Sequence, residues 1–305
     1  MTEIPMEIAP HIRDALAERR PVVALESTII THGMPYPENI DTARRVEQAV
    51  RDAGALPATI AILGGRIHVG LSDDQLQDLS RAKGVRKLSR ADLAACLTRQ
   101  ETGSTTVAAT MICAHLAGIA VFATGGIGGV HRGAEHSFDV SADLHELSRT
   151  PVTVVCAGPK AILDIDKTLE VLETLGVPVI THGADAVPAF WSRDSGRISP
   201  LRMDSAAEIA RAHRMRAALG LSGGQLVANP VPQHAEIPLD QITPLIDRAI
   251  DEARAAGISA KEVTPHLLDR MLELTKGRSL ATNVDLVLNN ADLATQIAIA
   301  LCEME

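Results

Sequence analysis

Short apolar runs alternate with stretches of helical periodicity along roughly the first 180 residues, and this alternation restricts the fold more than any other feature. The five runs that suit buried strands are Val22–Leu25, Thr59–Leu63, Ile119–Ala123, Val152–Cys156 and Val177–Ile180. Strands buried on both faces are typical of parallel sheets, because each crossover places a helix against one face. The pattern therefore predicts an α/β fold: a three-layer α/β/α sandwich whose central sheet is mainly parallel, with a mixed sheet as the alternative.

The later part of the chain follows a different pattern. From about Ser205 helical periodicity dominates, and we expect helices at 206–219, 239–256, 265–275 and 279–301 that flank the sheet. No Pro/Ser-rich linker, charge block or internal repeat interrupts residues 1–305. We therefore expect a single domain with a helix-rich C-terminal part.

The charge balance argues against several partners. The chain has 29 basic and 38 acidic side chains, which gives a net charge of −9. Nucleic acids and anionic membranes are bound by a surplus of lysine and arginine. One Trp, one Tyr and three Phe are also too few to stack on single-stranded bases. We expect no nucleic-acid partner and no membrane partner.

Targeting and cysteine patterns predict a cytoplasmic protein. Acidic residues are spread through 1–20, unlike a signal peptide, and five glycines interrupt the most apolar stretch, 114–130. The four cysteines are scattered and form no C-x-x-C pair, so we expect reduced thiols in the core and no zinc cluster.

Glu26 directly follows the first apolar run, at a strand end where ligands of open α/β sheets bind. Desolvation between apolar residues favours a protonated carboxyl, which suits a general acid. The alternative is a glutamate that pairs with a buried arginine or caps a loop.

A glycine-rich run, Thr124–Gly133, follows the third apolar run. Glycines permit positive φ and close approach of backbone amides to an anion, while His131 and Arg132 add side-chain donors. The run matches neither a dinucleotide fingerprint nor a P-loop, so phosphate binding and a structural turn both remain open.

Asp139 and Asp143 are two carboxylates four residues apart, with hydroxyls nearby. Such a group suits an oxygen-liganded cation such as Mg²⁺ or Mn²⁺. The commoner explanation of the same residues is a helix start, with Ser141 as the cap and Asp143 beside the positive helix end.

Lys160 follows a strand and a Gly-Pro turn, and we expect it where the next helix begins. A positive helix end and an apolar shell would favour a neutral, nucleophilic amine of the kind that Schiff-base chemistry needs. An ordinary surface lysine at a helix start is the alternative. Lys87 is either a phosphate contact or a solvated lysine, and Asn283 begins an amide-rich helix whose polar face reaches a pocket or caps neighbours.

Several of these segments closely resemble one family, pseudouridine-5′-phosphate glycosidase, also called pseudouridylate synthase. The resemblance spans nearly the whole chain, and the segments that carry it are Val22–Pro35, Ala123–His136, Asp139–Leu144, Cys156–Lys160, Pro188–Trp191, Ala228–Pro232 and Asn283–Ala291. It implies reversible cleavage of the C–C glycosidic bond of pseudouridine 5′-phosphate to uracil and ribose 5-phosphate. By this resemblance Lys160 is the nucleophile that forms an iminium with the ring-opened ribose, and Glu26 is the proton donor.

The resemblance also implies a metal, substrate contacts and an assembly. Asp139 is expected to be the ligand, or the water-mediated anchor, of one Mn²⁺ per subunit, and the subunits to form a homotrimer. The residues expected to contact substrate are Lys87, Val107, Ser141, Ala142 and Asp143, with His131 and Asn283 at further pocket positions. Pro159 departs from the family pattern, but a proline is tolerated in a first helical turn, so we expect Lys160 to keep its place.

Two other functions fit the same residues. One is another lysine-dependent sugar-phosphate lyase of the aldolase type, which would form adducts with ribose 5-phosphate without consuming uracil. The other is a non-catalytic phosphosugar-binding module, whose binding would survive the loss of both Lys160 and Glu26.

Overall fold

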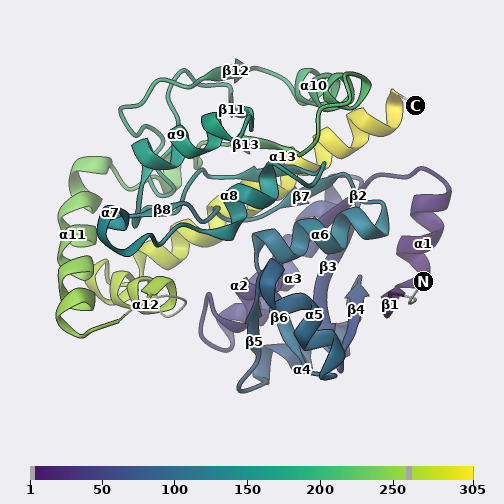
Figure 1. The fold of residues 1–305 in the computed structure, drawn as a ribbon, viewed down its shortest axis with the longest axis horizontal. Coiled ribbons are helices and arrows are strands. Elements are labelled where there is room, and N and C mark those ends of the chain that lie inside the picture. The colour runs from purple at the N-terminus through teal and green to yellow at the C-terminus, as the bar shows by residue number, and fades with distance from the viewer. Residues whose placement is uncertain (1–3, 259–262, 305) are drawn as a thin grey trace.

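The computed structural model describes residues 4–258 and 263–304, and their strands form a central mixed sheet (Figure 1). Its order is β1-β4-β3-β2-β7-β9-β13-β11-β12, with β6 also pairing with β3 and β5 with β6. Neighbours pair in parallel except β3 with β4 and β3 with β6, so the predicted mainly parallel sheet is confirmed. The strands are β1 Met6–Ile8, β2 Val22–Leu25, β3 Leu56–Leu63, β4 Arg66–Val69, β5 Arg86–Leu88, β6 Gly103–Thr105, β7 Val121–Ala123, β9 Thr153–Cys156, β11 Val179–His182, β12 Leu201–Met203 and β13 Gln225–Ala228.

A short antiparallel pair lies apart from this sheet and joins β8, Val130–His131, to β10, Leu163–Asp164. The helices are α1 Pro10–Ala17, α2 Thr28–Thr31, α3 Glu38–Asp52, α4 Asp73–Arg81, α5 Arg90–Thr98, α6 Val107–Ala117, α7 Ala134–Ser137, α8 Ala142–Leu147, α9 Ile165–Thr174, α10 Ala206–Ala218, α11 Leu239–Ala255, α12 Val263–Leu274 and α13 Arg278–Glu303, with a 3₁₀ turn at Gln233–Ala235.

The three layers follow from the alternation of side chains along each strand. In β2, Val23 and Leu25 join an apolar cluster that contains side chains of α3, α10, α11 and α13. Val22 and Ala24 point the other way, into a cluster with α1, α6, α8 and α9. Because both faces of the strand are covered by helices, every residue of β2 is buried and the predicted α/β/α sandwich is confirmed.

The C-terminal helices were predicted correctly, and α13 is the central one. It contacts β2, β7 and β9 as well as α3 and α10, and its yellow ribbon runs across the sheet in Figure 1. By length and composition alone this helix could cross a membrane, but 67% of its apolar window is buried inside the protein, as expected of a core helix.

The sheet also contains strands that the sequence patterns do not predict. The most important is β13, which lies between β9 and β11 although its region was expected to be mainly helical. Its apolar part, Leu226–Ala228, is only three residues long, so it gives a weak strand signal. The other missed strands, β1, β4, β5, β6 and β12, are three or four residues long.

Candidate active site

Two cavities beyond the strand ends share four lining residues: Glu26, Thr28, Lys87 and Lys160. We call the larger one, of about 270 Å³, the polar chamber; it is also lined by Ser89, Thr106, Val107, Gly128, His131, Asp139, Val140, Ser141, Ala142, Asp143 and Leu163. We call the smaller one, of about 70 Å³, the apolar chamber; it is also lined by Ile29, His32, Gly33, Met34, Gly125, Gly126, Phe190, Leu268, Asn283 and Leu286. The fold therefore gathers every residue named above as catalytic, substrate-contacting or metal-binding around these two adjacent cavities. Arg132, the other donor that the glycine-rich run offered, lines neither of them and pairs with Asp247 instead.

Glu26 follows the last residue of β2 and is half-buried. Two threonine hydroxyls donate to its carboxylate, Thr28 to Oε2 and Thr124 to Oε1. Thr28 opens α2 and Thr124 follows β7, the parallel neighbour of β2, so adjacent strand ends supply both the acid and its donors. Within the described residues the contacts of Glu26 are these hydroxyls, not the buried arginine that sequence offered as an alternative.

Lys160 lies in the loop between β9 and β10, and its predicted place at a helix start is wrong. Helix α9 begins only at Ile165, where Asp164 is the cap and accepts a hydrogen bond from the Lys167 backbone N–H at 3.1 Å. The intervening Leu163 and Asp164 pair with β8, a long-range contact that the local pattern could not reveal. The positive end of a helix is therefore not what sets the environment of this amine.

Backbone bonds to the glycine-rich run fix the Lys160 loop instead. The Ile127 N–H donates to the Gly158 carbonyl at 3.2 Å, and the Lys160 N–H donates to the Ile127 carbonyl at 3.1 Å. These two bonds flank Pro159, which faces Ile127 in a parallel bridge and needs no N–H there. The proline is thus tolerated next to Lys160, in an extended bridge and not in the helical turn that we expected.

Three glycines of this run, Gly126, Gly128 and Gly129, serve close packing and do not adopt positive φ, whereas Gly133 adopts a φ of 87°. A Cβ on Gly128 would come within 2.3 Å of Ser141 Oγ. The Gly128 N–H donates to Asp143 Oδ2 at 2.8 Å, so the anion that this amide binds is a side chain of the protein.

Asp143 is buried and its second oxygen, Oδ1, accepts a hydrogen bond from the Ala108 N–H at 2.9 Å. Ser141 Oγ accepts from the Asp143 N–H at 3.2 Å and caps α8, which confirms the helix-start interpretation of these residues. Asp143 therefore ties the glycine-rich run to the start of α6, where Val107 lines the polar chamber. Asp143 already occupies the Ala108 N–H, but the partial positive charge of the helix start still faces this wall of the chamber and suits an anionic group.

His131 and Asp139 lie side by side on another wall of the polar chamber, with Nδ1 and Oδ2 at 4.0 Å. Burial lowers the pKa of the His131 imidazole; the Asp139 carboxylate opposes this shift, and the charges of Lys160 and Lys87 add to it. Both lysines thus lie close enough to act on His131 electrostatically. The imidazole is therefore held neutral at neutral pH.

Asp139 is the carboxylate best placed to hold a cation at the polar chamber, since 36% of its side chain is exposed. The described residues contain no cluster of three His, Cys, Asp or Glu side chains suited to a metal ion. A single carboxylate fits a hard divalent cation that keeps several waters and completes its shell with substrate oxygens.

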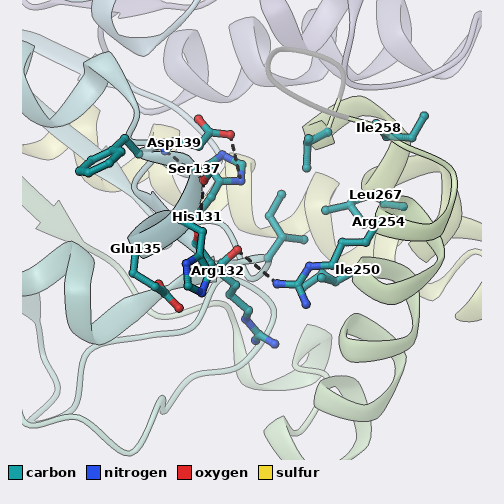
Figure 2. Close-up of a pocket in the computed structure, with 15 residues that line it drawn as sticks. His131, Arg132, Glu135, Ser137, Asp139, Ile250, Arg254, Ile258 and Leu267 are labelled. Atoms are coloured by element: carbon teal, nitrogen blue, oxygen red, sulfur yellow. Dashed lines mark hydrogen bonds and ion pairs between the residues drawn. The ribbon is translucent and has the colours of Figure 1, made fainter.

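The His131–Asp139 pair also borders a third cavity, of about 900 Å³ (Figure 2). One wall comes from α7 and its flanking loops, and the facing wall from α11 and α12 with Ile250, Arg254 and Leu267. The Arg254 guanidinium reaches across and donates to the Arg132 carbonyl at 3.4 Å. The sequence patterns point to the histidine and the aspartate but not to this apolar wall.

Asn283 lies in the apolar chamber, where its Oδ1 accepts a hydrogen bond from Trp191 Nε1 at 2.7 Å. His32, which sequence analysis did not single out, lines the same chamber, and Thr31 Oγ1 contacts its Nδ1 at 2.6 Å. Burial, followed by the charge of Lys87, lowers the pKa of His32. His32 could have been found from the sequence, because it lies within the Val22–Pro35 segment that carries the family resemblance, just after the hydroxyl-rich end of β2.

Comparison with known proteins agrees with the family resemblance of the sequence segments. The family model described as "Indigoidine synthase A like protein" matches residues 11–300. A pseudouridine-5′-phosphate glycosidase of Jannaschia sp. (strain CCS1) is 66% identical over 298 residues, which cover 98% of this chain and 99% of the relative. The protein of the same name from Deinococcus radiodurans is 58% identical over 96% of this chain and 94% of its own length.

Solved structures also match over almost the full length. The prealnumycin C-glycosynthase AlnA, solved in complex with ribulose 5-phosphate, has a TM-score of 0.92 and 37% identity, covering 99% of each chain. An indigoidine synthase A-like protein from Thermotoga maritima has a TM-score of 0.90 and 35% identity, covering 99% of this chain and 98% of its own.

Proposed function

The chain belongs to the family of indigoidine synthase A like proteins, and we propose that it acts as a pseudouridine-5′-phosphate glycosidase. It cleaves the C–C glycosidic bond reversibly, giving uracil and ribose 5-phosphate. The observation that carries this proposal is that Glu26 and Lys160, an acid and an amine from different strand ends, line the same two chambers. One chamber is rich in polar groups and helix starts, and the other is largely apolar, which matches the two halves of this substrate.

The polar chamber suits the ribose phosphate. The start of α6, the start of α8 and the Lys87 side chain all border it, and they would offer the partial positive charge of two helix ends and one full positive charge to a phosphate. The complex of the C-glycosynthase AlnA with ribulose 5-phosphate supports a pentose phosphate as the ligand of this fold.

The apolar chamber suits the uracil ring. Phe190 and Leu286 would contact its faces, while His32 and Asn283 would reach its polar edge. A planar base would then lie with its C5 atom towards Glu26 and Lys160, which border both chambers.

The first chemical step opens the sugar. The C1′–O4′ bond breaks, O4′ takes a proton from Glu26, and the neutral Lys160 nitrogen forms a bond to C1′. The new secondary ammonium then returns a proton to the Glu26 carboxylate, so that the acid is ready for a second transfer.

The second step breaks the C–C bond. The nitrogen lone pair forms a C1′=N iminium while the electron pair of the C1′–C5 bond leaves with uracil, and C5 takes the proton from Glu26. Water then adds to the iminium and releases ribose 5-phosphate and free Lys160. A carbon leaving group is poor, and the iminium is what stabilises the electron deficiency at C1′.

We further propose that Mn²⁺ binds at Asp139, one per subunit, with His131 beside it. When bound, the cation would offset the charge of the substrate phosphate. The net charge of −9 of the chain makes such compensation useful, since an acidic protein repels a dianion. The same family resemblance supports a homotrimer in the cytoplasm, and light scattering of the purified protein tests the assembly.

A synthesis assay tests the reaction directly. Purified protein is mixed with uracil, ribose 5-phosphate and Mn²⁺, and we expect a C-linked nucleotide by mass spectrometry, with chelation of Mn²⁺ lowering its yield. A lysine-dependent lyase of the aldolase type would instead form ribose 5-phosphate adducts and leave uracil unconsumed. A binding module would hold the sugar phosphate without turnover under any metal.

A further inference from the structure

A buried amide of α13 reaches the strand ends behind Glu26. Asn290 is fully buried, and its Nδ2 donates to the Thr124 carbonyl at 2.9 Å and, more weakly, to the Gly125 carbonyl at 3.4 Å. Thr124 is the residue whose hydroxyl donates to Glu26 Oε1. One side chain of the C-terminal helix thus holds the backbone that presents a donor to the acid.

The oxygen of the Asn290 amide is linked, through Asn229, to the strand that precedes the Lys160 loop. Asn290 Oδ1 accepts a hydrogen bond from Asn229 Nδ2 at 3.2 Å, and the Asn229 N–H donates to the Cys156 carbonyl at 2.7 Å. Cys156 is the last residue of β9, four positions before Lys160. The Asn290 amide therefore links the ends of β7 and β13 directly, and through Asn229 it reaches the end of β9.

The Thr124 backbone is held by a second hydrogen bond, in which its N–H donates to the Val155 carbonyl at 3.0 Å. Pairing with the neighbouring strand thus sets the position of Thr124 along the sheet, and the Asn290 bond sets the direction of its carbonyl. Only an amide side chain of this length can both donate to carbonyls and accept from Asn229 here. An alanine would remove the donor to the Thr124 carbonyl, whereas the Gly125 carbonyl would keep the Ala157 N–H and the Asn229 amide would keep the Asn289 carbonyl.

We infer that Asn290 is a positioning residue for the general acid, acting through Thr124 on Glu26. This inference rests on the proposed function. Its neighbour Asn289 is a matched control: it lies on the same helix, and its Nδ2 donates to the Pro230 carbonyl at 3.1 Å and not to Thr124.

The experiment compares Asn290→Ala with Asn289→Ala in two assays. The first is the rate of uracil release from pseudouridine 5′-phosphate, which needs the acid. The second is the yield of the borohydride-trapped adduct at saturating ribose 5-phosphate, which reports on the amine. We expect Asn290→Ala to lower kcat about tenfold to a hundredfold, with KM and adduct yield within about twofold of wild type, since misplacing a catalytic group costs rate more than binding. Asn289→Ala is expected to stay close to wild type in both assays.

Two further variants separate positioning from folding. Asn290→Ser keeps one donor and is expected to fall between wild type and Asn290→Ala. In a Thr124→Val background, Asn290→Ala is expected to change kcat by less than about twofold, because residues that act through one another are non-additive.

Three results would overturn the inference: equal losses of uracil release and adduct yield in Asn290→Ala, additive effects with Thr124→Val, or loss of folding in both Asn290 variants. Absence of adduct and of uracil release in the wild-type protein would count against the proposed function itself.

Discussion

Glu26 and Lys160 line the same two chambers, yet the fold holds them in different ways. The Glu26 side chain is fixed at both carboxylate oxygens by threonine hydroxyls. For Lys160 it is the backbone that is fixed. Its N–H donates to the Ile127 carbonyl, and its carbonyl accepts a hydrogen bond from the Leu163 N–H at 3.0 Å. Within residues 4–258 and 263–304, its amine forms no hydrogen bond or ion pair.

The difference matches the two roles. An acid that must deliver protons along fixed directions gains from being oriented before the substrate binds. A nucleophile that bonds to C1′, becomes part of an iminium and is released again must follow a moving atom, and a free side chain on a fixed backbone allows this. We therefore expect substitutions around Glu26 to lower kcat, and substitution of the Lys160 amine itself to abolish turnover.

Lys160→Ala should have the largest effect. Without the amine no covalent route remains, and we expect turnover to fall by about 10⁴-fold or more, to the detection limit. Lys160→Arg keeps the positive charge and should be equally inactive, as measured by uracil release. Substantial turnover by either variant would contradict the covalent role proposed for this lysine.

Glu26→Gln should be the next most severe change. A general acid typically contributes about 10²- to 10⁴-fold, and we expect kcat to fall within that range while the ribose 5-phosphate adduct still forms. Glu47→Gln is the control, because Glu47 is a buried glutamate that, like Glu26, accepts a threonine hydroxyl, from Thr59 at 2.7 Å, but lies outside both chambers. Equal losses in the two variants would show that Glu26 contributes only to folding.

Thr28→Val should have a smaller effect, since one of the two donors to Glu26 would remain. We expect kcat to fall about tenfold, consistent with the loss of one hydrogen bond to a charged group, and Thr28→Ser to retain most of the activity. The measurement is steady-state kinetics of uracil release. If valine were as active as serine, the orienting role of this hydroxyl would be wrong.

The smallest effect should come from the opposite end of β9, where His213 Nδ1 contacts Thr153 Oγ1 at 2.9 Å. Burial lowers the pKa of His213 in the folded state, and the charges of Arg214 and Arg216 add to the shift. The unfolded chain therefore takes up this proton first as pH falls through about 6.5, and folding stability falls with it.

His213→Gln should reduce that loss of stability between pH 8 and pH 5.5, as measured by denaturant unfolding, and leave kcat unchanged. A clear change in kcat would mean that the far end of β9 is coupled to the site, and would contradict an account in which catalysis depends on how Glu26 and Lys160 are held.

Much of the fold was predictable because buried strands carry continuous apolar residues. Val22–Leu25 gave the exact bounds of β2, and four C-terminal helices were found from their periodicity. β13 was missed because three apolar residues do not distinguish a strand from a helix segment. Its place in the sheet is decided by β9 and β11, which are distant in sequence.

The site was predictable to the extent that strand ends converge. Glu26, Lys160 and Asp139 were named from their local patterns and from the family resemblance, and the fold brings them to one place. The surroundings of Lys160 were not predictable, because the pairing of Leu163 with His131 replaces the expected helix start. The Asn290 bond to Thr124 joins residues 166 positions apart, and no local pattern carries such information.

The most direct test of the covalent account is borohydride reduction during turnover of pseudouridine 5′-phosphate, followed by mass mapping of peptides. The account predicts a reduced five-carbon sugar phosphate attached to Lys160 and to no other lysine. Full uracil release with an unmodified Lys160, or the same adduct on a different residue, would contradict it.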